Sequence, residues 1–423
     1  MKSIVRVKAK GKGRQGSAGS AAPAAEAELA ALDSRVELIQ ALIPLGLQAV
    51  NELLQQEVAT LAGPRYQRRG GVPGYDRWGS QSGSVYLADQ KVAVTVPRVR
   101  DVRHDQELPL STYQALRQPR RAEEAALRKI LKGLSCRSYE ACVEPVAETF
   151  GLKASSLSRR FKRASARKLA ELQERDLSSY DLVGLFLDGK TFGEDEMLIA
   201  LGVTISGQKV VLGFVQTATE NAPVCAAFLR SLVERGLKYD QGLLVVIDGA
   251  KGLRKAVGQV FAKKAAVQRC HWHKRENVLG YLPVGLQPVF KRKLQAAYEK
   301  PTYAAAKAAL KRVRAELART NASAVKSLDE GLEETLTLHR LGLFRELGRS
   351  FKTTNCIENL NALIGQRTDK VDYWRNADQK HRWLATSLLD IEPRLRKVCG
   401  YQALARLRGA LQAELNGTAE KVA

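Results

Sequence analysis

The sequence predicts an α/β core, and the prediction depends on the order of apolar runs between residues 182 and 277. Three strand-like runs follow one another, VGLFLDG, MLIALGVTI and KVVLGFVQT. A helix (223–236), a strand (LLVVIDG), a second helix (252–261) and a fifth strand (AAVQRC) come next. Three successive strands followed by helix, strand, helix and strand form the order of a ribonuclease H-like core, in which the first and fourth strands are neighbours.

The composition indicates a protein that binds nucleic acid inside a cell. The chain has 423 residues, with 68 Lys and Arg against 44 Asp and Glu, giving a formal charge of +24. Such an excess predicts a polyanionic partner, and this length predicts about two to four structural units. No apolar run approaches the roughly 18 residues that span a bilayer, and residues 1–15 lack the apolar stretch of a secretory signal. Six cysteines without a CxxC pair favour reduced thiols in a cytoplasm.

The amino-terminal part is predicted to contain a tail, a helix, a basic loop and a small β-hairpin. Residues 1–22 predict a disordered basic tail, and residues 23–119 the other three elements. Between residues 63 and 83, arginines and aromatic residues alternate among glycines, which suits contact with DNA; a plain basic surface loop is the alternative. The hairpin covers residues 84–101, and Pro97 ends its second strand. The arginines predicted to bind DNA here are Arg65, Arg68, Arg69 and Arg77.

Residues 120–178 predict a helix-turn-helix DNA-binding region. Glycines at 133 and 151 end two helices, and a third helix, SLSRRFKRASARKLAEL, follows. Its basic side chains suit entry into a major groove, and the predicted contacts are Arg159, Arg160, Lys162 and Arg163. The alternative is a solvated basic helix, and Pro145 fits poorly inside the helix before it.

The predicted core is divided by a helical insertion. Residues 179–280 carry its first part, whereas residues 281–350 lose the strand pattern and are rich in Ala, Leu, Lys and Arg. Residues 351–423 complete the core with a helix that carries Glu358 and with further C-terminal helices. The predicted fold is therefore an α/β ribonuclease H-like catalytic core interrupted by an all-helical insertion, preceded by the helix-turn-helix region and the small β-hairpin.

Three carboxylates are the candidate catalytic and metal-binding residues. Asp188 and Asp248 each end a strand-like run and precede a glycine, and neighbouring strands would bring them together. With Glu358 they would hold two Mg²⁺ ions, or Mn²⁺ in their place, for in-line attack of a water or a 3′-hydroxyl on a phosphodiester. A lone Asp-Gly is most often a turn, but two of them in so basic a chain favour the catalytic interpretation. The competing acids are Glu194, Asp195 and Glu196, expected in a solvated turn, and Glu220, expected to cap a helix.

Cys270 and His273 form a Cys-x2-His pair. A structural Zn²⁺ site needs four ligands, and the remaining histidines, His104, His339 and His381, do not supply a second pair. The sequence therefore favours Cys270 packed at a strand end. His273 is expected to donate a hydrogen bond to a scissile phosphate or to a carboxylate.

The motifs around these residues resemble those of a known family. They are LDGK at Asp188, TENAP at 219–223, VIDGAKGLRKAV at Asp248, QRCHWHKRENV at 268–278 and TTNCIENLNALIGQR around Glu358. In content, order and spacing they resemble the Mutator-like family of bacterial insertion-sequence DDE transposases, over roughly residues 60–400. One departure is that Glu276 separates Arg275 from Asn277, which are adjacent in the family.

The resemblance implies a catalytic triad of Asp188, Asp248 and Glu358, with Cys270 and His273 as the family's Cys-x2-His motif. It implies Mg²⁺-dependent cleavage and strand transfer of double-stranded DNA, namely the terminal inverted repeats and the target. It also implies a homo-oligomer, at least a dimer, in the nucleoid region of a bacterial cytoplasm. Two alternatives stay open: a DNA-binding regulator with a dormant nuclease core, and a structure-specific nuclease on the same fold. The three carboxylates argue against the first, and the separate DNA-binding region argues against the second.

Overall fold

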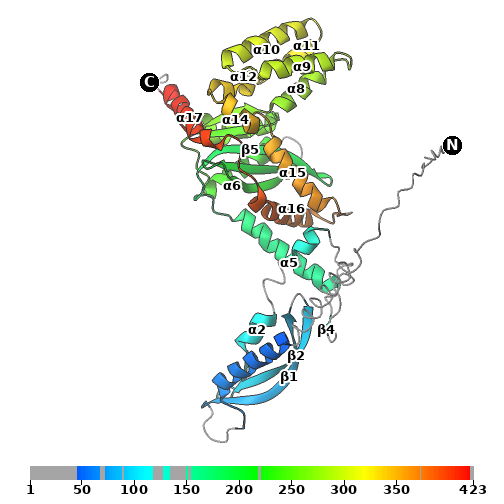
Figure 1. Cartoon of the computed structure of the whole chain (residues 1–423), viewed down its shortest axis with the longest axis vertical. Coiled ribbons are helices and arrows are strands. Elements are labelled where there is room, and N and C mark those ends of the chain that lie inside the picture. Colours follow the sequence, from blue (N-terminus) through cyan, green and yellow to red (C-terminus); the bar gives the residue numbers. More distant parts are fainter. Residues whose placement is uncertain are drawn as a thin grey trace, which may run out of the picture. The chain divides into compact units, whose positions relative to one another are not determined.

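The computed structural model describes residues 45–66, 72–87, 90–117, 127–133, 149–150, 154–217, 221–371 and 373–419. The chain divides into two compact units (Figure 1). Unit 1 comprises Met1–Ala126 and Arg137–Ala154, and unit 2 comprises Leu127–Cys136 and Ser155–Ala423. The predicted basic tail and most of the first helix of the predicted helix-turn-helix lie outside the described residues.

Unit 1 is a helix packed on an antiparallel sheet. Its strands are β1 (Tyr75–Leu87), β2 (Gln90–Asp101), β3 (Gln106–Leu108) and β4 (Thr149–Phe150), and β2 pairs with each of the others. The helix over residues 45–62 buries Val50, Leu54 and Val58 against the valines of β1 and β2. Glu57 of that helix accepts hydrogen bonds from the backbone amides of Ser111 and Thr112, which begin α2 (Ser111–Arg117).

The hairpin in unit 1 is longer than the sequence predicts. The expected loop over residues 63–83 is wrong from Tyr75 onward, because β1 begins there. Pro97 does not end the second strand, since β2 continues to Asp101. Pro97 pairs with Ser80 beside a register shift between Arg77 and Ser80, and a bulge is where a strand tolerates a residue without an N–H.

Unit 2 contains a five-stranded sheet in the order β7-β6-β5-β8-β9. The strands are β5 (Leu182–Phe192), β6 (Asp195–Thr204), β7 (Lys209–Thr217), β8 (Leu243–Ile247) and β9 (Ala265–Arg269). The first three are antiparallel, whereas β8 runs parallel to β5 and β9 parallel to β8. The predicted succession of five strands is confirmed. Asp195 and Glu196 are strand residues, so of the three acids expected in the turn only Glu194 lies in it.

Helices cover both faces of this sheet. Leu185 and Leu187 of β5 pack with α6 (Ala222–Glu234) and α7 (Lys251–Phe261) on one face. Phe186 packs on the other face with α14 (Phe344–Phe351), α15 (Asn355–Thr368), α16 (Ala377–Ile391) and α17 (Leu404–Ala419). Alternating side chains of one strand therefore enter two separate cores, as expected for a sheet buried on both faces.

The segment between β9 and α14 is helical and has its own apolar core. It contains α8 (His271–Leu279), α9 (Gln287–Tyr298), α10 (Tyr303–Ala318), α11 (Ala322–Asp329), α12 (Leu332–Thr335) and α13 (Thr337–Arg340). Residues of α8 to α11 form a cluster separate from the two sheet cores. No helix in the described part of the chain is long and apolar enough to cross a membrane.

Candidate catalytic site

The two candidate aspartates lie level with each other on neighbouring parallel strands. The register pairs Phe186 with Val246, so that Asp188 and Asp248 occupy equivalent positions two residues further on. Neighbouring strands are about 4.8 Å apart, and the side chains at these positions leave the same face of the sheet. Asp188 lies within β5 and not at its tip as expected, because β5 continues in its pairing with β6 after β8 has ended.

Asp188 is buried and costly to ionise. Its side chain accepts a hydrogen bond from Asn361 Nδ2 at 3.1 Å, and the residue is 7% exposed. Burial first, and the charge of Asp248 second, raise the pKa of Asp188 to about 7, although the charge of His273 acts in the opposite direction. The charges of Glu358 and Glu196 raise this pKa further. Several acids therefore face one small volume, an arrangement that a bound cation would stabilise.

Asp248 also stabilises the turn that follows β8. Its Oδ1 accepts a hydrogen bond from the backbone amide of Ala250 at 2.9 Å. This is the local bond expected of a turn aspartate. Its second carboxylate oxygen is the one left for another ligand.

Glu358 comes to the two aspartates on α15, which packs against β5. The helix begins after Thr354, whose hydroxyl donates a hydrogen bond to Glu358 Oε1 at 2.6 Å. The charge of Glu358 reaches Asp188, where it raises the pKa of the carboxyl. The structure thus brings Glu358 near enough to act electrostatically on Asp188, with its carboxylate held toward Thr354.

Cys270 and His273 lie at the start of α8 beside this group. Cys270 is fully buried after β9, and the Thr354 hydroxyl is 3.5 Å from its Sγ and 3.4 Å from His273 Nδ1. Burial alone would lower the pKa of His273, but the hydrogen bond with Cys270 and the charges of Asp188 and Asp248 raise it to about 9. His273 is therefore a cation that faces the aspartates at neutral pH.

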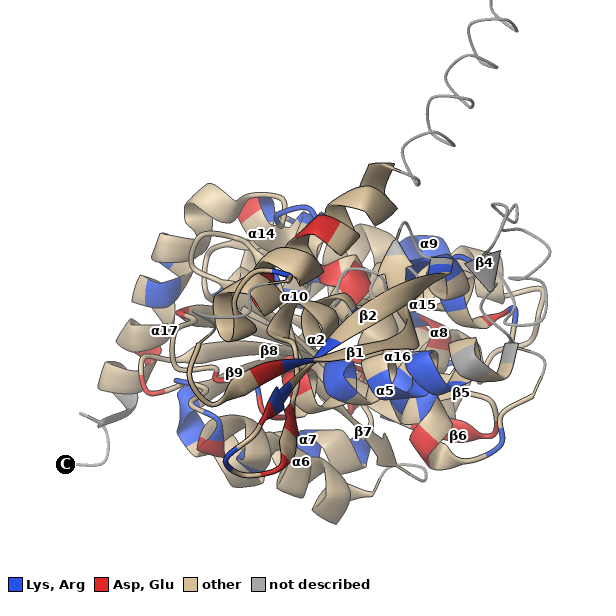
Figure 2. Cartoon of the chain, turned by 90° about the horizontal axis from the view of Figure 1, so that it is seen from below, with Lys and Arg blue, Asp and Glu red and all other residues tan. Residues whose placement is uncertain are grey.

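The predicted DNA-binding residues differ in exposure. Several basic residues lie along α5 (Ala154–Gln173), coloured blue in Figure 2. Arg159, Lys162 and Arg163 are exposed, whereas Arg160 is 9% exposed. Leu157 and Ala164, three residues before and four after Arg160, are also buried. Helical spacing therefore places Arg160 on the buried face, and DNA contact by the four residues stays a prediction.

The basic residues of unit 1 are divided in the same way. Arg65 is exposed, and Arg68 and Arg69 lie outside the described residues. Arg77 is half-buried and donates hydrogen bonds to the carbonyl of Gly63 and to Gln55 Oε1, at 2.9 and 3.3 Å. These bonds give Arg77 a structural role that the sequence does not reveal.

Two residues near the carboxylates were missing from the sequence prediction. Thr354 is one of them, and its four-residue spacing to Glu358 on one helix face is a readable signal for the bond between them. Trp272 is 46% exposed and packs edge-on against His273. An exposed tryptophan has no such signal, because its burial depends on the tertiary structure.

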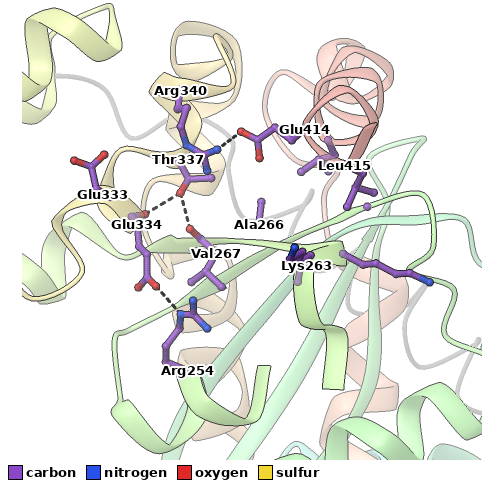
Figure 3. A pocket seen from close by; sticks show the side chains of 14 residues that line it. Arg254, Lys263, Ala266, Val267, Glu333, Glu334, Thr337, Arg340, Glu414 and Leu415 are labelled. Carbon is purple, nitrogen blue, oxygen red and sulfur yellow. Dashed lines mark hydrogen bonds and ion pairs between the residues drawn. The ribbon is translucent and has the colours of Figure 1, made fainter. Parts of the chain in front are cut away.

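A separate pocket of about 280 Å³ lies between β9, α12 and α17, away from these carboxylates (Figure 3). Arg254 pairs there with Glu334, and Arg340 pairs with Glu414. Thr337 donates a hydrogen bond to the carbonyl of Val267 at 2.6 Å. These interactions join the helical segment and the C-terminal helix to the sheet, and the pocket is therefore structural.

The site combines acids from two inner, neighbouring strands of a sheet with a glutamate on a helix, in a strongly basic chain. The family model described as "Transposase, Mutator family" matches residues 19–396, which is most of the sequence. The chain belongs to this family of transposases.

Named relatives come from several bacteria. The transposase for insertion sequence element IS905 of Lactococcus lactis is 28% identical over 351 residues, covering 81% of this chain and 86% of that protein. The transposase for IS6120 of Mycolicibacterium smegmatis is 30% identical, covering 56% and 74%. The transposase for IS1081 of Mycobacterium tuberculosis is 26% identical, covering 85% and 87%.

Proposed function

We propose that this chain is the transposase of an insertion sequence, and that it cleaves and transfers DNA strands with Mg²⁺ at Asp188, Asp248 and Glu358. The observation that carries the proposal is the register of β5 and β8, which sets two acids side by side. Glu358 joins them from α15, and its charge acts on Asp188. The names of the relatives point to the same activity.

The donor set fits a hard cation. Magnesium binds carboxylate oxygens and keeps several waters, and the mutual repulsion of Asp188, Asp248 and Glu358 favours a positive ion between them. Asn361 Oδ1 is buried beside Asp188, and within the described residues it has no hydrogen-bond partner. Such an oxygen suits a water of a hydrated ion. Bound Mg²⁺, or Mn²⁺ in its place, would neutralise phosphate charge and activate the attacking hydroxyl.

The protein's own side chains would orient the carboxylates and neutralise part of their charge. The Thr354 hydroxyl fixes one oxygen of Glu358, and Asn361 fixes one oxygen of Asp188. The cationic ring of His273 balances part of the carboxylate charge and is placed to donate a hydrogen bond to a phosphate. These three positioning residues would hold the acids before DNA arrives.

The fold supports the same proposal. The strand order and directions of the sheet in unit 2 support a ribonuclease H-like core, in which the helices from α8 to α13 would be the insertion. We propose α5 as the recognition helix of a helix-turn-helix that binds terminal inverted repeats through Arg159, Lys162 and Arg163. Because two element ends must be held together, the active form would be a homo-oligomer, at least a dimer, in the bacterial cytoplasm at the nucleoid.

A nicking assay on labelled DNA that carries the element's own ends tests this function. Asp188→Asn, Asp248→Asn and Glu358→Gln should each lower Mg²⁺-dependent cleavage by at least about 10³-fold, comparable to losing a key electrostatic group, and should leave end binding intact. Glu194→Gln, in the turn before β6, is the control and should cleave normally. End binding without cleavage by the unmodified protein would favour the dormant regulator, and cleavage of branched DNA without end specificity would favour the structure-specific nuclease.

A further inference from the structure

The side chains of Cys270, His273 and Glu358 form a compact group of mixed ligand types. Cys270 precedes α8, His273 lies in the first turn of α8, and Glu358 lies in α15. One sulfur, one imidazole nitrogen and one carboxylate oxygen lie within 4.8 Å of one another. Magnesium prefers oxygen ligands, so the sulfur and nitrogen make this group chemically distinct from the two aspartates.

The Thr354 hydroxyl lies among these three ligand atoms. Its Oγ1 is 2.6 Å from Glu358 Oε1, 3.4 Å from His273 Nδ1 and 3.5 Å from Cys270 Sγ. Thr354 is 0% exposed. One hydroxyl oxygen therefore contacts all three ligand atoms, and a bound ion would displace it from between them.

We propose that Cys270, His273 and Glu358 bind one thiophilic divalent cation, of which Zn²⁺ is the prototype. Thiolate, neutral imidazole and carboxylate are the protein ligands of Zn²⁺, so binding would release the proton that His273 carries at neutral pH and the thiol proton of Cys270. Three ligands leave a fourth position for water. Bonds of about 2.0–2.3 Å hold tetrahedral ligand atoms roughly 3.5 Å apart, so small side-chain rotations complete the site. Cys270 is buried and the other two residues are half-buried.

Binding of this ion would oppose strand cleavage, and this consequence rests on the proposed function. Glu358 belongs both to the proposed thiophilic cation site, with Cys270 and His273, and to the proposed Mg²⁺ site. An ion held by Cys270 and His273 draws the Glu358 carboxylate toward them and away from Asp188 and Asp248. The cation site thus provides an inhibitory control that responds to thiophilic metals.

Cobalt spectroscopy on the full chain tests the binding directly. Co²⁺ titrated into the reduced protein should give one equivalent of tetrahedral cobalt with a thiolate-to-metal charge-transfer band, and Zn²⁺ should displace it. Cys270→Ser should remove this band and weaken Co²⁺ binding more than about 100-fold, beyond the loss of an outer-shell partner. Cys399→Ser, whose thiol is exposed elsewhere, should keep the band. Asp188→Asn should also keep it, which separates this site from the proposed Mg²⁺ site.

The remaining outcomes decide the proposal. Absence of the band in the unmodified protein, or a band that survives Cys270→Ser, would overturn it. His273→Gln keeps the thiol and should weaken Co²⁺ binding to a similar degree. The two variants together prevent a folding defect in one of them from deciding whether the site exists. Unchanged binding in His273→Gln would also overturn the proposal. Circular dichroism checks that both variants are folded. Failure of the unmodified protein to cleave DNA would refute the proposed function and would leave the cobalt result standing.

Discussion

Replacing Asp188 by asparagine should stabilise the metal-free protein. The residue is 7% exposed and its pKa is raised from 3.8 to about 7, so the folded state binds a proton that the unfolded state has released. Between these two pH values, stability attributable to Asp188 falls as pH rises. Each pKa unit corresponds to about 1.4 kcal/mol, so ionised Asp188 costs the fold at most about 4 kcal/mol at pH 8. Asparagine has the same shape and can still accept the hydrogen bond from Asn361.

Urea unfolding in EDTA at pH 5 and pH 8 measures this effect. Tryptophan fluorescence is a suitable probe, because Trp374 and Trp383 pack against each other in unit 2. We expect Asp188→Asn to be more stable than the unmodified protein by about 1–4 kcal/mol at pH 8, and by less at pH 5. Mg²⁺ should stabilise the unmodified protein and not the variant.

Asp390→Asn is the matched control. Asp390 receives hydrogen bonds from Arg367 at 2.9 and 3.0 Å and is part of an ordinary ion pair, so its neutralisation should destabilise the protein by about 0.5–3 kcal/mol. The two substitutions remove the same charge and should act with opposite sign. If Asp188→Asn lowers stability at pH 8 as the control does, Asp188 is a structural acid and the reasoning from its burial fails.

Three further predictions concern the helical segment, the recognition helix and Thr354. Glu334→Ala leaves the side chain of Arg269, which is 7% exposed, without the carboxylate that lies 2.6 Å from it. This substitution should lower the free energy of unfolding in urea by about 3–5 kcal/mol. Glu330 lies 3.8 Å from Arg269 and is more exposed, so Glu330→Ala should lower it by less than about 1 kcal/mol. Neutralising Arg159, Lys162 and Arg163 to glutamine should weaken binding to element ends and reduce the slope of log K against log salt by about 3, while the same change at Lys311 and Arg312 of α10 should not; equal effects of both sets would indicate non-specific attraction. Thr354→Val should lower end cleavage about 10-fold or more and Thr354→Ser should retain it, because only the hydroxyl orients Glu358; equal rates in both variants would exclude that role.

The strands of unit 2 could be predicted because their apolar runs are long, uninterrupted and bounded by glycines. The juxtaposition of Asp188 and Asp248 followed from strand order alone. The register that sets them level could not be read from the sequence, because it depends on how β5 and β8 pack between two helical layers. For the same reason the sequence placed Asp188 at a strand end, whereas pairing with β6 extends β5 beyond it.

The sequence does not show which basic residues have partners within the fold. Arg77 donates hydrogen bonds to Gly63 and Gln55, which depend on the tertiary structure of unit 1. The burial of Arg160 could have been predicted, because its spacing from Leu157 and Ala164 places it on the apolar face of α5. Glu358 was chosen by position and by resemblance, and only the packing of α15 on β5 shows why it can reach the aspartates.

Cleavage of the polypeptide by bound iron tests the central claim most directly, namely that Asp188, Asp248 and Glu358 share one cation site. Fe²⁺ in that site, with ascorbate and peroxide, produces hydroxyl radicals that cut the chain beside its ligands. We predict cuts near residues 188, 248 and 358 together, suppressed by excess Mg²⁺, and we expect the cuts near 188 and 248 to be lost in Asp188→Asn. Cuts at only one of the three segments, or cuts that Mg²⁺ does not suppress, would contradict a shared magnesium site.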